Sequence, residues 1–307
     1  MKRKFFQKLL LLSLLLFVLV ACKPVKEKTP ERTPFLGGTT GLSIEFVDFR
    51  SEVFDGGGDF FDVTVRLQNK GEWTVSKDKV RVKLFGINPS EFGVLEEQLV
   101  GRPTEDLPER KRDLSGSIIE SLPVTVEFKN LNYKSRLAGA SLTFPLAASV
   151  CYNYGTKAES LLCVRKNILN PEAGGLCEIN EAKTVFNSGA PIQIENLRET
   201  ARTSDKIGFS FDIVKKGEGK VFASGSNCLE ENKVSVTVDA GLGEISCTGL
   251  TTSGTVASGT VTLFDGKKSI SCTQQVKPAD FEQRLTITAS YDFEGVKQTS
   301  LTVKRSG

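Results

Sequence analysis

Acidic residues are the main side chains in this sequence whose spacing could support chemistry, because histidine is absent. Without histidine the chain lacks the commonest general base and the commonest zinc ligand. Asp55, Asp59 and Asp62 surround a run of three glycines, and carboxylates on a tight turn are ligands that calcium prefers. Their spacing does not match an EF-hand loop, so a flexible turn between two strands is the simpler interpretation. We expect no metal ion and no cofactor.

Recognisable catalytic motifs are missing from the sequence. It contains no G-x-S-x-G elbow, no phosphate-binding loop and no G-x-G-x-x-G segment. Paired carboxylates are the catalytic chemistry that remains. We therefore expect no catalytic residues, and we predict that the chain is not an enzyme.

The best candidate for a binding contact is a charged segment within residues 93–117. Arg110, Lys111 and Arg112 could face an acidic polymer or a lipid headgroup, because long loops on rigid β-folds often carry binding function. The alternative is a solvated loop, since acidic side chains nearby neutralise the three cations. These acidic residues are Glu105, Asp106, Glu109 and Asp113.

Residues 1–21 have the three parts of an export signal. Basic residues precede an apolar run over residues 9–20, which is shorter than the ~18 residues of a membrane-spanning helix. The ending Leu19-Val20-Ala21-Cys22 resembles the lipobox of prokaryotic surface lipoproteins, archaeal ones among them. This resemblance implies cleavage before Cys22 and a lipid on its thiol, which would anchor the protein to the membrane. The alternative is an ordinary signal peptide followed by an incidental cysteine.

The charges of the remaining chain nearly cancel. Outside residues 1–21 the sequence holds 36 basic and 37 acidic residues, so we expect no nucleic-acid partner. Residues 23–34 contain three prolines among charged residues, which is typical of a tether rather than of a folded element. Residues 22–41 are therefore predicted to be a lipidated cysteine followed by a flexible tether.

Alternating apolar residues dominate the rest of the chain. Phe61, Val63, Val65 and Leu67 alternate with polar residues, as in a strand with one buried face. Similar alternation recurs between turn residues, and no segment keeps a helical period. The sequence therefore predicts an all-β fold of two-layered antiparallel sandwiches. Trp73 follows the clearest strand, and we expect it to cover a core edge, with sugar stacking as the alternative.

The chain also repeats itself. The strand over residues 61–67 and the following Lys70-Gly71-Glu72 recur 146 residues later, ending in Lys216-Gly217-Glu218. Tyr152-Asn153-Tyr154 likewise matches Tyr291-Asp292-Phe293 at an offset of 139. The order is the same in both copies, which indicates two copies of one β-domain.

The cysteines indicate three disulfides. Seven are present, and an even set of six remains if Cys22 carries lipid, which in an exported chain predicts disulfides. Several pairings are possible. Cys151 and Cys163 flank turn residues and are both absent from the second copy, so we predict Cys151–Cys163. Similar strand contexts favour Cys247–Cys272, and elimination leaves Cys177–Cys228.

The segment FDVTVRLQNKG at residues 61–71 is similar to the Asn-Lys-Gly-containing, adhesion-related immunoglobulin-like domains of bacterial and archaeal surface proteins. In the second copy Lys215 replaces the asparagine. This resemblance implies two tandem immunoglobulin-like sandwiches after the signal peptide and the tether. We place them at residues 42–167 and 190–307, joined by an interdomain segment at 168–189.

Taken together, these features predict a lipid-anchored, extracytoplasmic protein of the cell surface or envelope. We expect a non-enzymatic structural, adhesive or protein-binding module that contacts other envelope proteins. The first alternative is an accessory subunit of a membrane secretion, pilus or transport assembly. A carbohydrate-binding or hydrolytic surface lipoprotein is the second alternative. The sequence names no small-molecule ligand.

Overall fold

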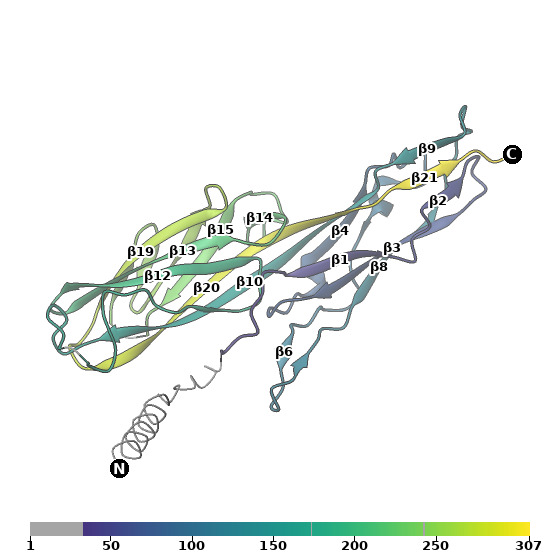
Figure 1. The fold of residues 1–307 in the computed structure, drawn as a ribbon. Coiled ribbons are helices and arrows are strands. Elements are labelled where there is room, and N and C mark those ends of the chain that lie inside the picture. Colours follow the sequence, from purple (N-terminus) through teal and green to yellow (C-terminus); the bar gives the residue numbers. More distant parts are fainter. Residues whose placement is uncertain (1–32, 173, 242) are drawn as a thin grey trace, which may run out of the picture. The chain divides into compact units, whose positions relative to one another are not determined.

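The computed structural model describes residues 33–172, 174–241 and 243–307, and over these ranges the chain is all-β (Figure 1). Within them we find no α-helix, and the two 3₁₀ turns are η1 (Lys77–Lys79) and η2 (Glu96–Leu99). The predicted all-β class is confirmed. The predicted signal peptide, Cys22 and residues 23–32 of the predicted tether lie outside the described residues. The prediction of a tether is wrong for residues 35–41, which belong to the compact unit and are hydrogen-bonded to it.

A small antiparallel sheet in the first half contains the strand with the clearest alternation. Its order is β1 (Leu42–Val47), β3 (Phe61–Asn69) and β8 (Val124–Leu131). The apolar residues of β3 at alternate positions are all buried, from Phe61 to Leu67, because successive side chains of a strand point to opposite faces. The prediction for this strand is confirmed.

The equivalent sheet of the second half has the order β12 (Ile192–Thr203), β13 (Lys206–Lys215), β19 (Lys267–Gln275) and β16 (Ile245–Cys247). Its β13 buries Ile207, Phe209, Phe211 and Ile213, which are the repeat counterparts of the buried residues of β3. A register shift interrupts the pairing of β12 with β13 between Glu195 and Arg198.

A nine-stranded sheet runs through both halves of the chain (Figure 1). At its centre lie β10 (Ala147–Val164) and β20 (Phe281–Gln298), which pair antiparallel over all 18 residues of each strand. First-half strands continue the sheet on one side, namely β4 (Val80–Phe85) and β5 (Val100–Gly101). Second-half strands continue it on the other side, namely β15 (Lys233–Asp239), β18 (Val256–Thr262) and β17 (Thr251–Ser253).

Two short strands extend this sheet off its main path. These are β11 (Phe186–Asn187), which pairs with β10, and β14 (Lys220–Ala223), which pairs with β20. Two smaller sheets complete the fold. One has the order β2 (Glu52–Phe54), β21 (Leu301–Lys304) and β9 (Ser141–Phe144), and the other pairs β6 (Lys111–Arg112) with β7 (Ile118–Ile119).

The two halves are built into each other. Residues from Phe35 to Gly307 form one compact unit, so the predicted boundary at residues 168–189 does not separate two compact units. The central sheet draws on both halves, and β21 near the C-terminus pairs with β2 and β9 of the first half. Their buried side chains form a shared hydrophobic core. The sheets are consistent with sandwich packing, with the two halves sharing a layer.

The sequence repeat has a structural meaning at the centre of this layer. Asn153 lies opposite Asp292 in the ladder, and Tyr154 lies opposite Tyr291. Asn153 and Asp292 are also counterparts in the repeat. The two central strands are therefore related locally by an approximate twofold axis through this pair.

Candidate functional site

The charged segment predicted to bind a partner forms a hairpin, and we call residues 110–120 the 110–120 hairpin (β6 in Figure 1). Lys111 pairs with Ile119 and Arg112 with Ile118 across its two strands. Every residue from 111 to 120 is exposed. Because side chains of a strand alternate between faces, each face of this ribbon carries one cation and one isoleucine.

Exposed aliphatic side chains accompany the cations of the hairpin. Leu114 at the tip is fully exposed, and Ile118 and Ile119 are 50% and 45% exposed. Leu122, just beyond the hairpin, is 76% exposed. Large apolar side chains gathered on a projecting element typically mark an interaction site. Sequence reasoning singled out the three cations and missed these aliphatic residues, although all four are visible in the sequence.

The tip of the hairpin is held by Asp113. Its carboxylate accepts hydrogen bonds from the Ser115 hydroxyl (2.7 Å) and the Ser117 N–H (2.8 Å). These bonds, the one from the Ser115 hydroxyl above all, hold the pKa of Asp113 below its ordinary value. Lys111 and Arg112 form no ion pair with any residue of the described ranges.

Arg110 fastens the base of the hairpin to the body. Its guanidinium donates to the Lys70 carbonyl oxygen at 2.9 Å and pairs with Glu120 at 2.9 Å. Its backbone N–H donates to the Gly71 carbonyl oxygen at 2.9 Å. Arg110 is therefore a structural contact, and only Lys111 and Arg112 of the three predicted binding cations face solvent.

The adjacent Glu72 holds the segment through which the chain enters the fold. Its carboxylate accepts hydrogen bonds from three backbone N–H groups: Leu36 at 2.8 Å, Gly37 at 2.9 Å and Gly189 at 2.7 Å. Sequence reasoning noted Glu72 only as part of a repeat. A local pattern could not predict this role, because its donors lie 35 or more residues away.

Asn69, the asparagine of the Asn-Lys-Gly motif, makes hydrogen bonds through both ends of its side-chain amide. It is completely buried, and its side chain donates to the carbonyl oxygens of Trp73 (2.7 Å) and Leu107 (3.2 Å). It accepts from the Gly71 N–H (3.1 Å) and the Tyr154 hydroxyl (2.9 Å). Since a buried amide needs partners for its oxygen and its nitrogen, this network fixes the turn after β3.

The tyrosines of the central strands bind the start of each half. The Tyr152 hydroxyl accepts from the N–H of Leu42, the first residue of β1, at 3.1 Å. The Tyr291 hydroxyl accepts from the N–H of Ile192, the first residue of β12, at 3.3 Å. Burial raises the pKa of both phenols far above its ordinary value. Both tyrosines therefore pack in the core with a hydrogen-bonded hydroxyl.

Asp55, the first residue of the candidate calcium turn, is buried and fully engaged. It accepts hydrogen bonds from the Ser306 hydroxyl (2.6 Å), the Ser306 N–H (2.8 Å) and the Leu137 N–H (2.7 Å). These bonds, led by that from the Ser306 hydroxyl, lower the pKa of Asp55 to about 2. Its structural role is to tie the C-terminal segment to the first half.

The other two aspartates of that turn face different partners. Asp59 pairs with Arg50 at 2.9 Å and accepts from the Phe54 N–H. Asp62 accepts from the Asn130 N–H at 2.8 Å. Because the three carboxylates bind separate groups and do not converge, the described residues here form no calcium-binding constellation.

The disulfides differ from two of the three predictions. The structure forms Cys151–Cys228, Cys163–Cys177 and Cys247–Cys272. The prediction of Cys247–Cys272 is confirmed, whereas Cys151–Cys163 and Cys177–Cys228 are wrong. Cys151 and Cys163 both lie on β10, where 12 residues of extended strand separate them by roughly 40 Å. A disulfide requires Cα atoms within about 7 Å, so residues of one continuous strand at this spacing cannot pair.

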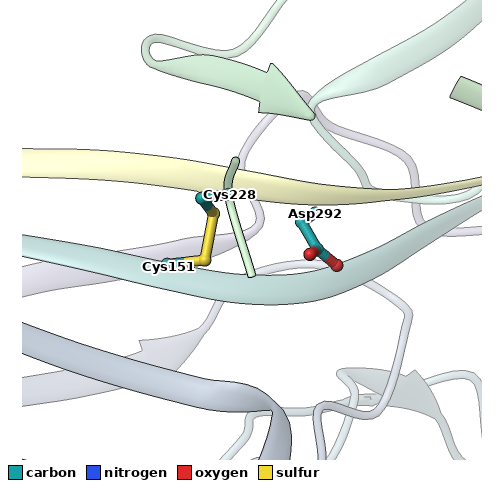
Figure 2. Close-up of side chains that lie close together, drawn as sticks. All are labelled: Cys151, Cys228 and Asp292. Atoms are coloured by element: carbon teal, nitrogen blue, oxygen red, sulfur yellow. A yellow bond between two sulfur atoms is a disulfide. The ribbon is translucent and has the colours of Figure 1, made fainter. Parts of the chain in front are cut away.

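Cys151, Cys228 and Asp292 form the one cluster of potential metal ligands found among the described residues (Figure 2). Both sulfurs are used in the disulfide. Asp292 accepts hydrogen bonds from the N–H groups of Gly225 (2.9 Å) and Asn227 (2.8 Å). The cluster is therefore a covalent and hydrogen-bonded clamp that fixes the loop of residues 225–228 to the central sheet.

Glu199 is a buried acid whose pKa is raised. Glu199 is completely buried, accepts from the Cys163 N–H at 2.9 Å and pairs with Lys183 at 3.1 Å. Burial raises its pKa to about 6, although the N–H of Cys163 and the charge of Lys183 act in the opposite direction. Since a buried backbone amide and a buried ammonium face it, Glu199 links residues 181–199 to the end of β10.

No protein-family model and no curated protein sequence matches the chain. Among solved structures, it is similar to the secreted serine protease VesC from Vibrio cholerae, with 8% identity over 82% of this chain and a TM-score of 0.19. The chain spans 50% of that protein. It is also similar to a structure titled complete manganese lipoxygenase of Gaeumannomyces graminis and partial zonadhesin of Komagataella pastoris. There the identity is 8%, the TM-score is 0.11, and 87% of this chain and 93% of that chain are covered.

The covalent cross-links indicate the compartment. Three disulfides are formed within the described residues, and disulfides persist in oxidising, extracytoplasmic environments. Over the described part of the chain no helix is long and apolar enough to cross a membrane.

Proposed function

We propose that the chain is a lipid-anchored surface or envelope protein whose halves are immunoglobulin-like modules with a non-enzymatic structural, adhesive or protein-binding role. The lipobox-like sequence ending at Cys22 supports the anchor, and the disulfides agree with export. The carboxylates considered for chemistry at Asp55, Asp59 and Asp62 are engaged by backbone amides, a hydroxyl or arginine, which favours a structural role over catalysis.

The observation that carries the proposal is the pairing of β10 with β20 along all 18 residues of each strand. Tandem modules joined by a flexible linker bend relative to each other. Here the shared ladder, together with Cys151–Cys228, resists such bending. A stiff unit of this kind suits a spacer that holds a binding surface at a fixed distance from its own membrane-proximal end.

A second candidate, an accessory subunit of a membrane secretion, pilus or transport assembly, is favoured by the exposed apolar residues of the 110–120 hairpin. Crosslinking in intact cells followed by mass spectrometry discriminates between the two. The proposed role predicts abundant links to the chain itself or to an abundant envelope protein. Links to one scarce membrane machine would support the second candidate instead.

The matched control is the Cys22→Ser variant. It keeps the described residues unchanged and removes the proposed attachment atom. We expect it to leave the membrane fraction and to lose the crosslinks. A variant that stays in the membrane fraction as completely as the wild type would contradict the lipid anchor.

A further inference from the structure

We propose that the 110–120 hairpin is a second membrane contact, which enters the headgroup region of the bilayer that holds the lipid anchor. This inference rests on the proposed lipidation of Cys22. The hairpin brings together fully exposed Leu114, half-exposed Ile118 and Ile119, and exposed Lys111 and Arg112. Aliphatic side chains with adjacent cations are the combination that binds an interface, since the cations reach the phosphates while the apolar atoms enter the acyl boundary.

The base of the hairpin lies close to Leu36 and Gly37, where the N-terminal segment joins the compact unit. Arg110 binds the carbonyl oxygens of Lys70 and Gly71, and Glu72 binds the N–H groups of Leu36 and Gly37. The base of the hairpin therefore lies within two residues of the attachment point of the N-terminal segment.

Chain length then restricts the distance to a bilayer. Cys22 precedes Leu36 by 14 residues, which span at most ~50 Å when fully extended. From Arg110 to Leu114 the hairpin extends at most ~15 Å. A lipid on Cys22 thus holds the bilayer surface within a tether length of the hairpin base, and the tip projects from that base.

The composition of the hairpin suits a bilayer surface, because each face of the ribbon pairs one cation with one exposed isoleucine. A membrane contact needs only a few apolar side chains once the anchor has localised the chain, because anchoring takes two weak signals. Lys111 and Arg112 add attraction to anionic lipids, while the bonds within the turn satisfy Asp113 in the polar headgroup layer.

Depth-dependent quenching tests the proposal on the full chain purified from membranes. The Leu114→Trp variant is reconstituted into vesicles of phosphatidylcholine and phosphatidylglycerol with brominated acyl chains, and the emission of Trp73 is subtracted using the unmodified chain. The matched control is Phe264→Trp, because Phe264 is 70% exposed at another turn and has Lys268 beside it. We expect quenching and a shift to shorter wavelength at position 114, and neither at position 264.

The outcomes separate this inference from the lipid anchor. If the chain floats with the vesicles and the probe at position 114 is not quenched, the hairpin contact is overturned and the anchor stands. If the purified chain does not float, the anchor and the inference both fail. A photocrosslinker at position 114 that captures a protein in cells, and no lipid, would also overturn the inference.

Discussion

The Lys-Gly-Glu turns of the two halves have the same sequence and different roles. In the first half the Glu72 carboxylate accepts hydrogen bonds from three backbone N–H groups, and Gly71 packs against Tyr154 and Gly189. In the second half Glu218 is exposed and accepts no hydrogen bond from the described residues, and it lines an open cavity of about 400 Å³. The first turn is a junction for three distant segments, whereas its counterpart binds one segment, through the N–H groups of Lys216 and Gly217 on the Pro191 carbonyl oxygen.

Neighbouring positions explain this difference. Asn69 organises the first turn, and Lys215 replaces it in the second, where its ammonium donates to the Gly219 carbonyl oxygen at 2.9 Å. The Tyr154 hydroxyl of the first half, which bonds Asn69, is lost at the counterpart Phe293. A repeated motif thus predicts a repeated backbone turn, while the side chains around it decide how many segments that turn binds.

The largest expected difference between the two turns comes from their glycines. A methyl group at Gly71 would overlap the Gly189 carbonyl oxygen and the Tyr154 hydroxyl, whereas at Gly217 it would meet the Pro191 Cβ at 2.7 Å. We expect Gly71→Ala to lower the free energy of unfolding by about 3 kcal/mol and Gly217→Ala by about 1 kcal/mol. Urea denaturation measures both, and equal losses would contradict the comparison.

The next largest effect is expected at the residue that opens each motif. Asn69→Ala removes four buried hydrogen bonds and leaves the Tyr154 hydroxyl with a weaker partner, which should cost about 2–3 kcal/mol. Lys215→Ala removes one partly exposed bond and should cost under about 1 kcal/mol. The same urea measurement compares them. A smaller loss for Asn69→Ala than for Lys215→Ala would show that the buried network is not what stabilises the first turn.

Buried acids of the two halves should respond to pH in opposite directions. The folded-state pKa of Glu199 is about 6 against an ordinary 4.5, so the folded state holds this proton more tightly. Its contribution to the free energy of unfolding therefore falls by about 2 kcal/mol as pH rises from 4.5 to 6. Asp55 in the first half has its pKa lowered from 3.8 to about 2, so its contribution is lost as pH falls through that range.

Unfolding of wild type, Glu199→Gln and Asp55→Asn between pH 2 and 7 separates the two contributions. Relative to wild type, Glu199→Gln should remove the decline between pH 4.5 and 6, and Asp55→Asn the decline below pH 3.8. A difference between Glu199→Gln and wild type that does not change with pH would show that Glu199 has an ordinary pKa in the folded protein.

The smallest effect is expected from the two glutamates. Glu72→Gln keeps the shape of the side chain and weakens hydrogen bonds that its charge strengthens, so we expect a loss of about 1 kcal/mol and faster hydrogen exchange at Leu36 and Gly37. Glu218→Gln should change neither quantity. Unchanged exchange at both amides in Glu72→Gln would remove Glu72 from the junction.

Local patterns predicted the local structure of this protein. The alternation from Phe61 to Leu67 predicts β3 because one buried face requires period two. The segment from Tyr152 to Glu159 contains asparagine, glycine and lysine, and these residue types predict a turn between Cys151 and Cys163. In the structure it is the middle of β10. Gly155 lies there because a Cβ would come 2.7 Å from the Trp73 indole, so this glycine marks a close approach rather than a turn.

Long-range pairing escaped prediction for a related reason. The disulfides of Cys151 and Cys163 depend on which loops lie beside β10, because their partners Cys228 and Cys177 are outside the strands. A period-two pattern does not specify such a partner. The repeat did place Asn153 and Asp292 as counterparts, yet their direct opposition in one ladder follows from the fold. In the same way, the sequence does not show that Arg110 binds the carbonyl oxygen of Lys70. It therefore does not distinguish Arg110 from the solvent-facing Lys111 and Arg112.

The intact mass of the protein purified from its own membranes tests whether Cys22 holds this disulfide-linked module at a membrane. We expect a chain that begins at Cys22, carries a lipid adduct on that residue and contains three disulfides after alkylation without reduction. A chain that retains residues 1–21, or one that begins elsewhere without an adduct, would contradict the claim.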